Sequence, residues 1–498
     1  MHGPLDSKIS GLGSLKIGGN PLLALASLLI LIGTSCTQDF SNINTNPNAP
    51  TDVQPSLLLR QVIWNYGERM SFDGFVAGNL LSQHYAEVDF NRFDRGLLLE
   101  PQFGGDPWPI FYQNLRDNEI ILQKSLESEA LAIYEGPARV MKAYMASVLT
   151  DMFGDVPYFE AVRGKDDGIV TPVYDNQEDI YLEDGGILDN LRRAKMAIQA
   201  SMDSPFSLEG DILFNGDLAS WERMANSLLL KSLLRISGQV AVAQEMQAIF
   251  EEGNYIETGS DDAAFNFTAG PPNNFRMATA RVGDFNNFVM SRTADSIFAQ
   301  LNDPRLEILF RPAANTGQFT GLANGIDPSQ TSIVVDDFAR PGTIFREETD
   351  QYQANFVTAW ETHFILAEAA LNGWIEADWT ALYRQGVRLA LEYWSAENAD
   401  AYLAQDLVNP DLNENALQLI ATQRWIAALG NGYEAWIEWR RTGFPQLLPI
   451  AASLNDDLIP IRFPYPTDEQ ALNFENWSQA AAATNGNSPN VPVWWDVD

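Results

Sequence analysis

Aromatic rings alternate with polar side chains in two stretches that lack helical periodicity, residues 83–108 and 265–288. Flat rings pack against the apolar faces of sugars or peptides, while amide, carboxylate and guanidinium groups hydrogen-bond to the polar edges of such ligands. Both stretches therefore have the composition of a ligand groove. The candidate ligand-binding residues are Tyr85, Phe90, Arg92, Phe93 and Trp108 first, and Phe275 and Phe285 second. For each ring the alternative is a buried core position, and Pro107 favours a helix start that would bury the indole of Trp108.

Composition limits the other chemistries. One cysteine and three histidines exclude an intrachain disulfide and a zinc site built from four cysteines or from two cysteines and two histidines. The sequence contains no GxSxG, no HExxH and no phosphate-binding P-loop. Its net charge of −35 repels phosphate backbones, so nucleic acid is not expected as a partner. We expect no cofactor and no metal site.

One short block of the sequence holds three acidic residues that could act as acid/base groups or as cation ligands, namely Asp151, Asp155 and Glu160. They stand around Gly154 and Pro157, and a helix end followed by a tight turn needs the same residue types without any ligand. We therefore interpret this block as structural.

A pair of arginines, Arg440 and Arg441, could hold an anionic ligand. Arg440 follows Trp436 by four residues and Arg441 follows Glu438 by three, so stacking and ion pairing within one helix explain both. The alternating asparagines of Asn42–Asn48 resemble a calcium loop only faintly, because carboxylates are scarce there.

The first residues have the pattern of an export signal. Lys8 and Lys16 precede an apolar run from Pro21 to Ile32, and Gly33–Ser35 lead directly into the only cysteine, Cys36. We predict a lipoprotein signal peptide over residues 1–35, lipid attachment at Cys36, and a flexible tether over residues 36–54. The alternative is an ordinary signal peptide with an incidental cysteine.

From Pro55 onward, apolar residues recur at helical spacing. The strongest stripes lie in residues 57–64, 138–148, 221–236, 365–370, 379–394, 417–429 and 433–441. Small residues such as Ala367 and Ala369 let helices approach closely, and Gly430–Gly432 is a helix stop between two of them. We predict a mostly α fold over residues 55–498, a single domain of tetratricopeptide-like helix pairs. The long segments Gly253–Ser291 and Arg311–Thr349 are predicted to be irregular loops.

Ordered blocks along the chain resemble one family, the SusD/RagB outer-membrane lipoproteins. The blocks are Asn44–Thr51, Thr150–Ala161, Gly216–Ser237, Asn302–Arg305, Ala367–Ala369, Trp436–Pro445, Pro460–Pro466 and Trp494–Asp496. They span nearly the whole chain after Cys36.

This resemblance implies a SusD-like helical binding protein anchored in the outer membrane and facing the cell exterior. It implies capture of an oligosaccharide, or of an oligopeptide, for a SusC-type TonB-dependent transporter, without catalysis or cofactor. Two alternatives remain at this point. A secreted glycoside hydrolase would need two carboxylates about 5 to 10 Å apart. A helical scaffold without a small ligand would leave the aromatic loops unexplained.

Overall fold

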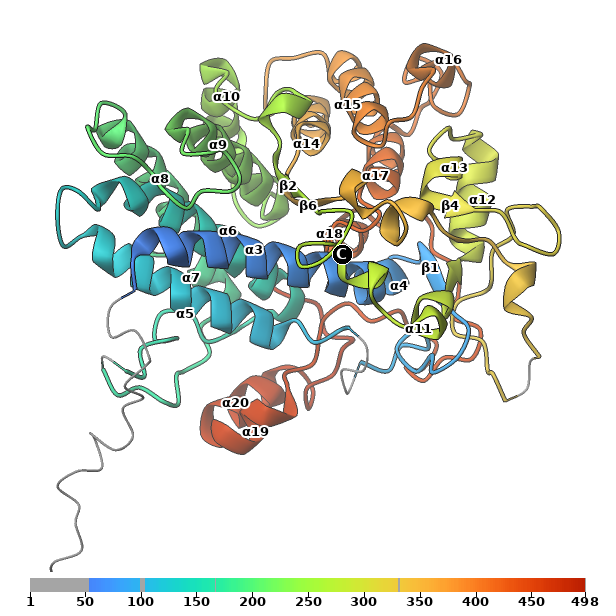
Figure 1. Cartoon of the computed structure of the whole chain (residues 1–498), viewed down its shortest axis with the longest axis horizontal. Helices are drawn as coiled ribbons and strands as arrows, with labels where there is room; N and C mark the ends of the chain where they lie inside the picture. Colours follow the sequence, from blue (N-terminus) through green and yellow to red (C-terminus); the bar gives the residue numbers. More distant parts are fainter. Residues whose placement is uncertain (1–52, 99–103, 166, 330–331, 498) are drawn as a thin grey trace, which may run out of the picture. The chain divides into compact units, whose positions relative to one another are not determined.

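Helices make up most of the regular secondary structure, as the spacing of apolar residues predicts (Figure 1). The computed structural model describes residues 53–98, 104–165, 167–329 and 332–497, and Cys36 with the predicted signal peptide lies outside them. Residues 54–498 cluster as one unit. No helix in the described part of the chain is both long and apolar enough to cross a membrane.

In the described part of the chain, nine helices form the main body and pack in succession. They are α3 (Pro55–Asp73), α5 (Trp108–Ser125), α6 (Glu135–Phe153), α8 (Ile187–Ser201), α9 (Leu218–Arg235), α14 (Ala359–Leu371), α15 (Trp379–Tyr393), α17 (Ala416–Ala427) and α18 (Glu434–Thr442). Each of the first five packs on the next, α9 packs on α14, and α14 packs on both α15 and α17. The mostly helical fold is confirmed.

Helix α6 shows how the sequence sets an element. Met141, Tyr144, Met145 and Val148 bury one stripe, as apolar residues three and four apart on a helix should. The helix ends at Phe153 because Gly154 takes a φ of 79°, a left-handed conformation that glycine adopts without steric cost.

Shorter elements fill the connections, and the strands among the described residues form three two-stranded antiparallel sheets, β1–β3, β2–β6 and β4–β5. The short helices are α4 (Asn79–Leu81), α7 (Gln177–Leu182), α10 (Ala243–Glu252), α11 (Val282–Asn286), α12 (Arg292–Leu301), α13 (Leu306–Leu309), α16 (Ala399–Leu403), α19 (Thr467–Leu472) and α20 (Phe474–Ala483). The strands are β1 (Tyr85–Glu87), β2 (Ala263–Asn266), β3 (Phe288–Met290), β4 (Phe310–Arg311), β5 (Arg340–Pro341) and β6 (Gln353–Val357). Single helical turns are η2 (Ala132–Tyr134), η3 (Gly259–Asp261), η4 (Arg276–Ala278), η5 (Val335–Asp337), η6 (Thr343–Phe345) and η7 (Thr349–Gln351).

The helical segment that follows α3 packs directly against the backbone of the turn between α17 and α18. A π-helical segment, η1 (Gly74–Gly78), joins α3 to α4. A Cβ at Gly74 would lie 2.3 Å from the Cα of Gly432, and a Cβ at Gly78 would lie 2.0 Å from the carbonyl oxygen of Gly432. Only glycine fits at these two positions, and this contact fixes the segment that carries Val76 and Leu80.

A buried ion cluster joins α9, α14, α17 and α18. Lys231 Nζ lies 2.9 Å from carboxylate oxygens of both Glu361 and Glu434. Glu438 accepts from Arg235 and, at 2.7 Å, from Nη1 of Arg424. The nearby cations hold the pKa of Glu438 well below its usual range. Each carboxylate is paired, as buried charges require.

Candidate functional site

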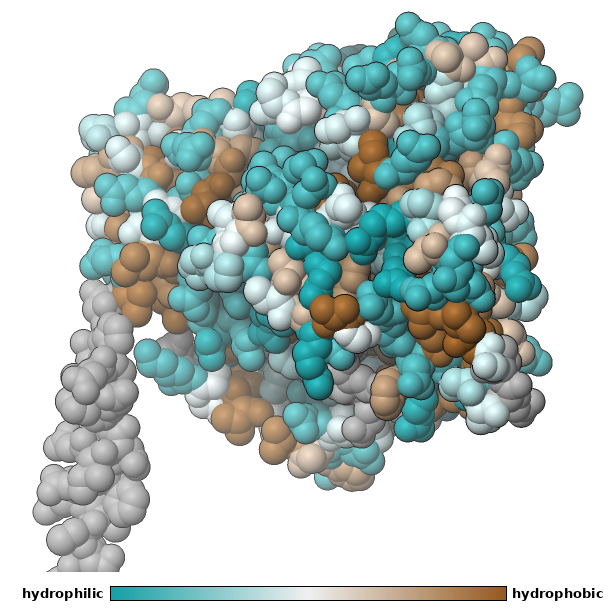
Figure 2. Space-filling model, turned by 45° about the vertical axis from the view of Figure 1, so that its right-hand side comes forward, coloured by the Kyte–Doolittle hydropathy of each residue, from teal (hydrophilic) through white to brown (hydrophobic). Residues whose placement is uncertain are grey.

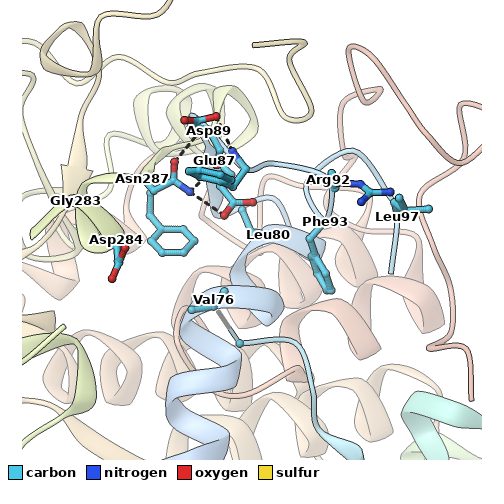
Figure 3. A pocket seen from close by; sticks show the side chains of 13 residues that line it. Val76, Leu80, Glu87, Asp89, Arg92, Phe93, Leu97, Gly283, Asp284 and Asn287 are labelled. Atoms are coloured by element: carbon cyan, nitrogen blue, oxygen red, sulfur yellow. Dashed lines mark hydrogen bonds between the residues drawn. The ribbon is translucent and has the colours of Figure 1, made fainter. Parts of the chain in front are cut away.

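A cavity of about 390 Å³ collects three of the predicted ligand-binding residues, Phe90, Arg92 and Phe93. We call it the Phe90 cavity. Its other lining residues are Val76, Leu80, Glu87, Asp89, Leu97, Gly104, Gly283, Asp284, Asn287 and Phe288. Figure 3 shows Glu87, Asp89 and Asn287 gathered on one side, Arg92 and Phe93 on the other, and Val76 on the helix below.

Pairing of β1 with β3 brings the two predicted aromatic stretches together. Glu87 lies opposite Phe288 in the antiparallel register, so Asn287 stands beside the end of β1. Its Nδ2 donates to Oε1 of Glu87 at 2.9 Å and to the carbonyl oxygen of Asp89 at 2.7 Å. Its Oδ1 accepts from the backbone N–H of Asp89 at 2.7 Å (Figure 3). One amide side chain therefore fixes the loop that follows β1.

Burial dominates the electrostatics of the cavity wall. Glu87 is 8% exposed, and its burial, reinforced by the neighbouring carboxylate of Asp94, raises its pKa well above the usual range. Burial likewise raises the pKa of Asp94 to about 6, although three N–H groups donate to its carboxylate. A carboxyl group that favours its neutral form can donate a hydrogen bond to a hydroxyl as well as accept one.

Phe90 is the most unusual residue of the site. Its side chain is 75% exposed, and its φ of 54° is left-handed, a conformation that costs a bulky residue free energy. The carboxylate of Asp89 accepts from the Phe90 N–H at 2.8 Å and stabilises this conformation. An exposed ring in a strained conformation therefore lines the cavity, and such strain persists only where the surrounding structure fixes it.

The rim carries one cation. Arg92 is exposed, and among the described residues its guanidinium has neither a hydrogen-bond nor an ion-pair partner. The carboxylates of Asp89 and Asp284 line the same cavity. The site thus offers ring faces, an amide, carboxyl groups and a guanidinium within one small volume.

Three predicted residues lie in the core instead. Tyr85 and Phe275 have no exposed surface and Phe285 is 1% exposed, which corrects the expectation that these rings face a ligand. They surround Phe75, whose ring centroid lies 5.2 Å from Tyr85, 5.7 Å from Phe275 and 6.2 Å from Phe285. These rings are buried because the loops that carry them pack against η1, a contact between distant parts of the chain that local sequence does not reveal.

Trp108 is also buried from solvent, because α5 begins at this residue after Pro107. Its indole packs on Phe153 with ring centroids 4.9 Å apart. It lines a different, aromatic cavity and does not join Phe90, Arg92 and Phe93. Glu87, Asp89 and Asp284 are not predictable as site residues from the sequence, since only the β1–β3 pairing places these ordinary surface residue types at one site.

The remaining sequence clusters are structural. Arg440 lies 4.2 Å from the Trp436 ring and donates to the carbonyls of Asp151 and Ile461, so it is not free to bind an anion. Asp151 pairs with Arg235 at 3.0 Å. Within the described ranges no group of histidine, cysteine or acidic side chains is arranged to hold a metal ion, and Asn42–Asn48 lies outside them.

A larger cavity of about 550 Å³ lies between α5, α6 and residues 158–167. Its charged groups pair with one another, Lys142 with Glu119 at 3.0 Å and Arg163 with Asp167 at 2.6 Å. It contains none of the predicted ligand-binding residues.

Comparison with known proteins identifies the family. A family model described as SusD-like, "Starch-binding associating with outer membrane", matches residues 47–466. The chain belongs to the SusD-like family. SusD-like proteins are non-catalytic binding proteins associated with the outer membrane, so the secreted glycoside hydrolase considered from the sequence is set aside.

Solved structures share the SusD-like fold. A chitin-binding protein is 26% identical with a TM-score of 0.76, over 89% of this chain and 100% of that one. A SusD homolog from Bacteroides fragilis is 23% identical with a TM-score of 0.75, over 89% and 99%. A chitin-binding SusD homolog from Flavobacterium johnsoniae is 23% identical with a TM-score of 0.74, over 89% and 98%. No curated protein matches the chain.

Proposed function

We propose that this SusD-like protein captures a neutral oligosaccharide in the Phe90 cavity and delivers it to a SusC-type TonB-dependent transporter. The observation that carries the proposal is the exposed, left-handed Phe90 above a wall of Glu87, Asp89 and Asn287. A pyranose ring packs its C–H face on such a ring and places its hydroxyls on the polar wall.

Charge favours a neutral ligand over an anionic one. The acidic side chains of Asp89 and Asp284 line the cavity and outnumber Arg92, the one basic residue in its described lining. The whole chain carries a net charge of −35, which lowers the local concentration of anions further. Figure 2 shows one face of the molecule as mostly hydrophilic with separate hydrophobic patches, which suits a surface exposed to water. The similarity to a chitin-binding protein supports a glycan ligand.

Calorimetric titration with chito-oligosaccharides, malto-oligosaccharides and a set of neutral peptides tests the ligand class. Binding of one glycan series, weakened in Phe90→Ala and in Asn287→Ala, is expected. Binding of peptides alone would contradict the proposal. New reducing ends that vanish in Glu87→Gln would show a hydrolase instead.

Cys36 is proposed as the lipid attachment site that anchors the chain in the outer membrane, facing outward. The support is the apolar run that ends at the only cysteine. Metabolic labelling with a fatty acid should be lost in Cys36→Ala, and the variant should become soluble. Labelling that persists in this variant would contradict the assignment.

Transfer to a transporter rests on family membership. Tagged protein purified from native membranes in mild detergent should carry a TonB-dependent transporter with it. Repeated purification without any such transporter would contradict this part of the proposal, whatever the glycan titrations show.

A further inference from the structure

A second cavity, of about 280 Å³, is lined by aromatic rings that the Phe90 cavity does not use. We call it the Trp477 cavity. It lies between the start of α5, the end of α6, residues 463–467 and α20. Its rings are Trp108, Phe153, Phe463, Tyr465 and Trp477, and its polar side chains include Asp106, Thr467, Gln470 and Asn487.

Neighbouring rings hold these aromatic side chains in place. Trp108 packs edge-on against Phe153 at 4.9 Å and against Tyr465 at 6.4 Å. Trp477 stacks on Phe474 with ring centroids 6.2 Å apart and an interplanar angle of 28°. Rings fixed in this way lose little conformational entropy when a ligand binds, which favours recognition of a flat apolar face.

The indole nitrogen of Trp477 indicates what the ligand must supply. It is buried and has no hydrogen-bond partner among the described residues. An indole N–H can only donate, so the missing partner is an acceptor oxygen. Ammonium and guanidinium groups have no acceptor, and an anion would meet Asp106 in the lining and Asp468 beside Thr467. A sugar hydroxyl or ring oxygen satisfies the donor without adding charge.

Trp477 lies on α20, and Figure 1 draws the α19–α20 pair below the main helices. Asn473 Nδ2 donates to the carbonyl of Pro172 at 2.8 Å, and Asn476 Nδ2 donates to the carbonyl of Thr171 at 3.0 Å. These side-chain hydrogen bonds join α20 to the 171–172 segment, and because the indole nitrogen is buried, a ligand can accept from its N–H only once neighbouring groups move aside.

The two cavities share one wall. Leu97 and Gly104 line the Phe90 cavity, and the next residues in the chain, Leu98 and Gly105, line the Trp477 cavity. Consecutive Cα atoms are about 3.8 Å apart. Across this wall the ring of Phe93 lies 6.1 Å from the ring of Phe463. A ligand site in one cavity is therefore adjacent to a ligand site in the other.

We propose that the Trp477 cavity is a second binding site for a sugar unit of the neutral glycan, with Trp477 and Trp108 as its ring platforms. This inference rests on the proposed function and adds a second site to it. The Phe90 cavity and the Trp477 cavity then contact different units of one polysaccharide.

Stoichiometry with short ligands tests the proposal. Trisaccharides of the chitin and starch series are titrated calorimetrically into the wild type, Phe90→Ala, Trp477→Ala and Trp477→Phe. Leu472→Ala is the matched control, because Leu472 is 76% exposed on the same helix pair and does not line the cavity.

The wild type and Leu472→Ala should bind two trisaccharides per chain, whereas Phe90→Ala and Trp477→Ala should each keep one site at wild-type affinity and weaken the other about 5- to 150-fold. Trp477→Phe keeps a ring but removes the donor, so it should weaken the second site on the order of 5- to 10-fold while the chain stays folded. One site per chain that is lost in Phe90→Ala and unchanged in both Trp477 variants overturns the second site and leaves the proposed function standing. Absence of binding to any glycan overturns both.

Discussion

Two phenylalanines from the same predicted set are expected to respond oppositely to truncation. Phe90 is 75% exposed, whereas Phe285 is 1% exposed among Phe75, Arg311 and Arg346. Burying a whole phenylalanine side chain contributes roughly 1.5–3 kcal/mol, so the quarter of Phe90 that is covered contributes under about 1 kcal/mol. Truncating a fully buried phenylalanine costs about 3–5 kcal/mol, because a cavity remains.

Phe90→Ala should therefore leave the free energy of unfolding within about 1 kcal/mol of the wild type, yet reduce glycan affinity about 5- to 150-fold, or 1–3 kcal/mol. Phe285→Ala should lose about 3–5 kcal/mol of stability. Any Phe285→Ala protein that folds should bind glycan with near-wild-type affinity, because the ring does not reach the cavity.

Urea unfolding followed by circular dichroism gives the stability, and calorimetry gives the affinity. Phe90→Gly is a useful companion, because glycine adopts the left-handed φ without the strain of roughly 1–2 kcal/mol that an L-residue bears. It should be at least as stable as Phe90→Ala while binding as weakly. A Phe90→Ala protein that binds normally but unfolds about 3 kcal/mol more easily would refute the assignment of this ring to the ligand.

Three further substitutions test the structure around the site. The pKa of Asp94 rises from 3.8 to about 6 on folding. Protonation of Asp94 therefore stabilises the fold at low pH, and about 3 kcal/mol of this stability is lost as the pH rises from about 4 through 6. The difference between the urea-unfolding curves of the wild type and Asp94→Asn across this pH range measures the loss. Glu438→Gln should lower the free energy of unfolding by about 3–5 kcal/mol at pH 7, because buried guanidinium groups lose a partner. Guanidinium chloride unfolding measures this change, and an unchanged stability would contradict the prediction. Gly78→Ala should lower the melting temperature more than the control Gly283→Ala. The new Cβ at residue 78 would meet the carbonyl oxygen of Gly432, whereas a Cβ at residue 283 would have nothing within 4 Å. Equal melting temperatures would contradict the close contact.

Helical spacing predicted the fold well because each helix needs a buried stripe that local sequence records. The stripe at residues 138–148 corresponds to α6, and the stripes at 417–429 and 433–441 correspond to α17 and α18. The ion cluster between these helices was not predictable, since Lys231 and Glu438 resemble surface residues until the helices pack.

The candidate site was predictable only in part. Composition selected Phe90, Arg92 and Phe93, which the structure brings together in one cavity. The same criterion selected Tyr85 and Phe285, which the structure buries, because an aromatic ring in a loop satisfies either role. Solvent exposure separates the two outcomes, and exposure depends on contacts between distant parts of the chain.

The contact of Gly74 and Gly78 with Gly432 constrains the order in which the protein can fold. The backbone N–H of Gly430 donates to Oδ1 of Asn79 at 3.0 Å across 351 residues, and the indole of Trp425 donates to the carbonyl of Ser82 across 343 residues. Contacts this distant in sequence form late, because a long loop must close first. The helical segment that carries Val76 and Leu80 therefore reaches its final position only after α17 and the following turn have been synthesised. A chain stopped before residue 430 would hold all the described lining residues of the Phe90 cavity without the backbone that fixes its base.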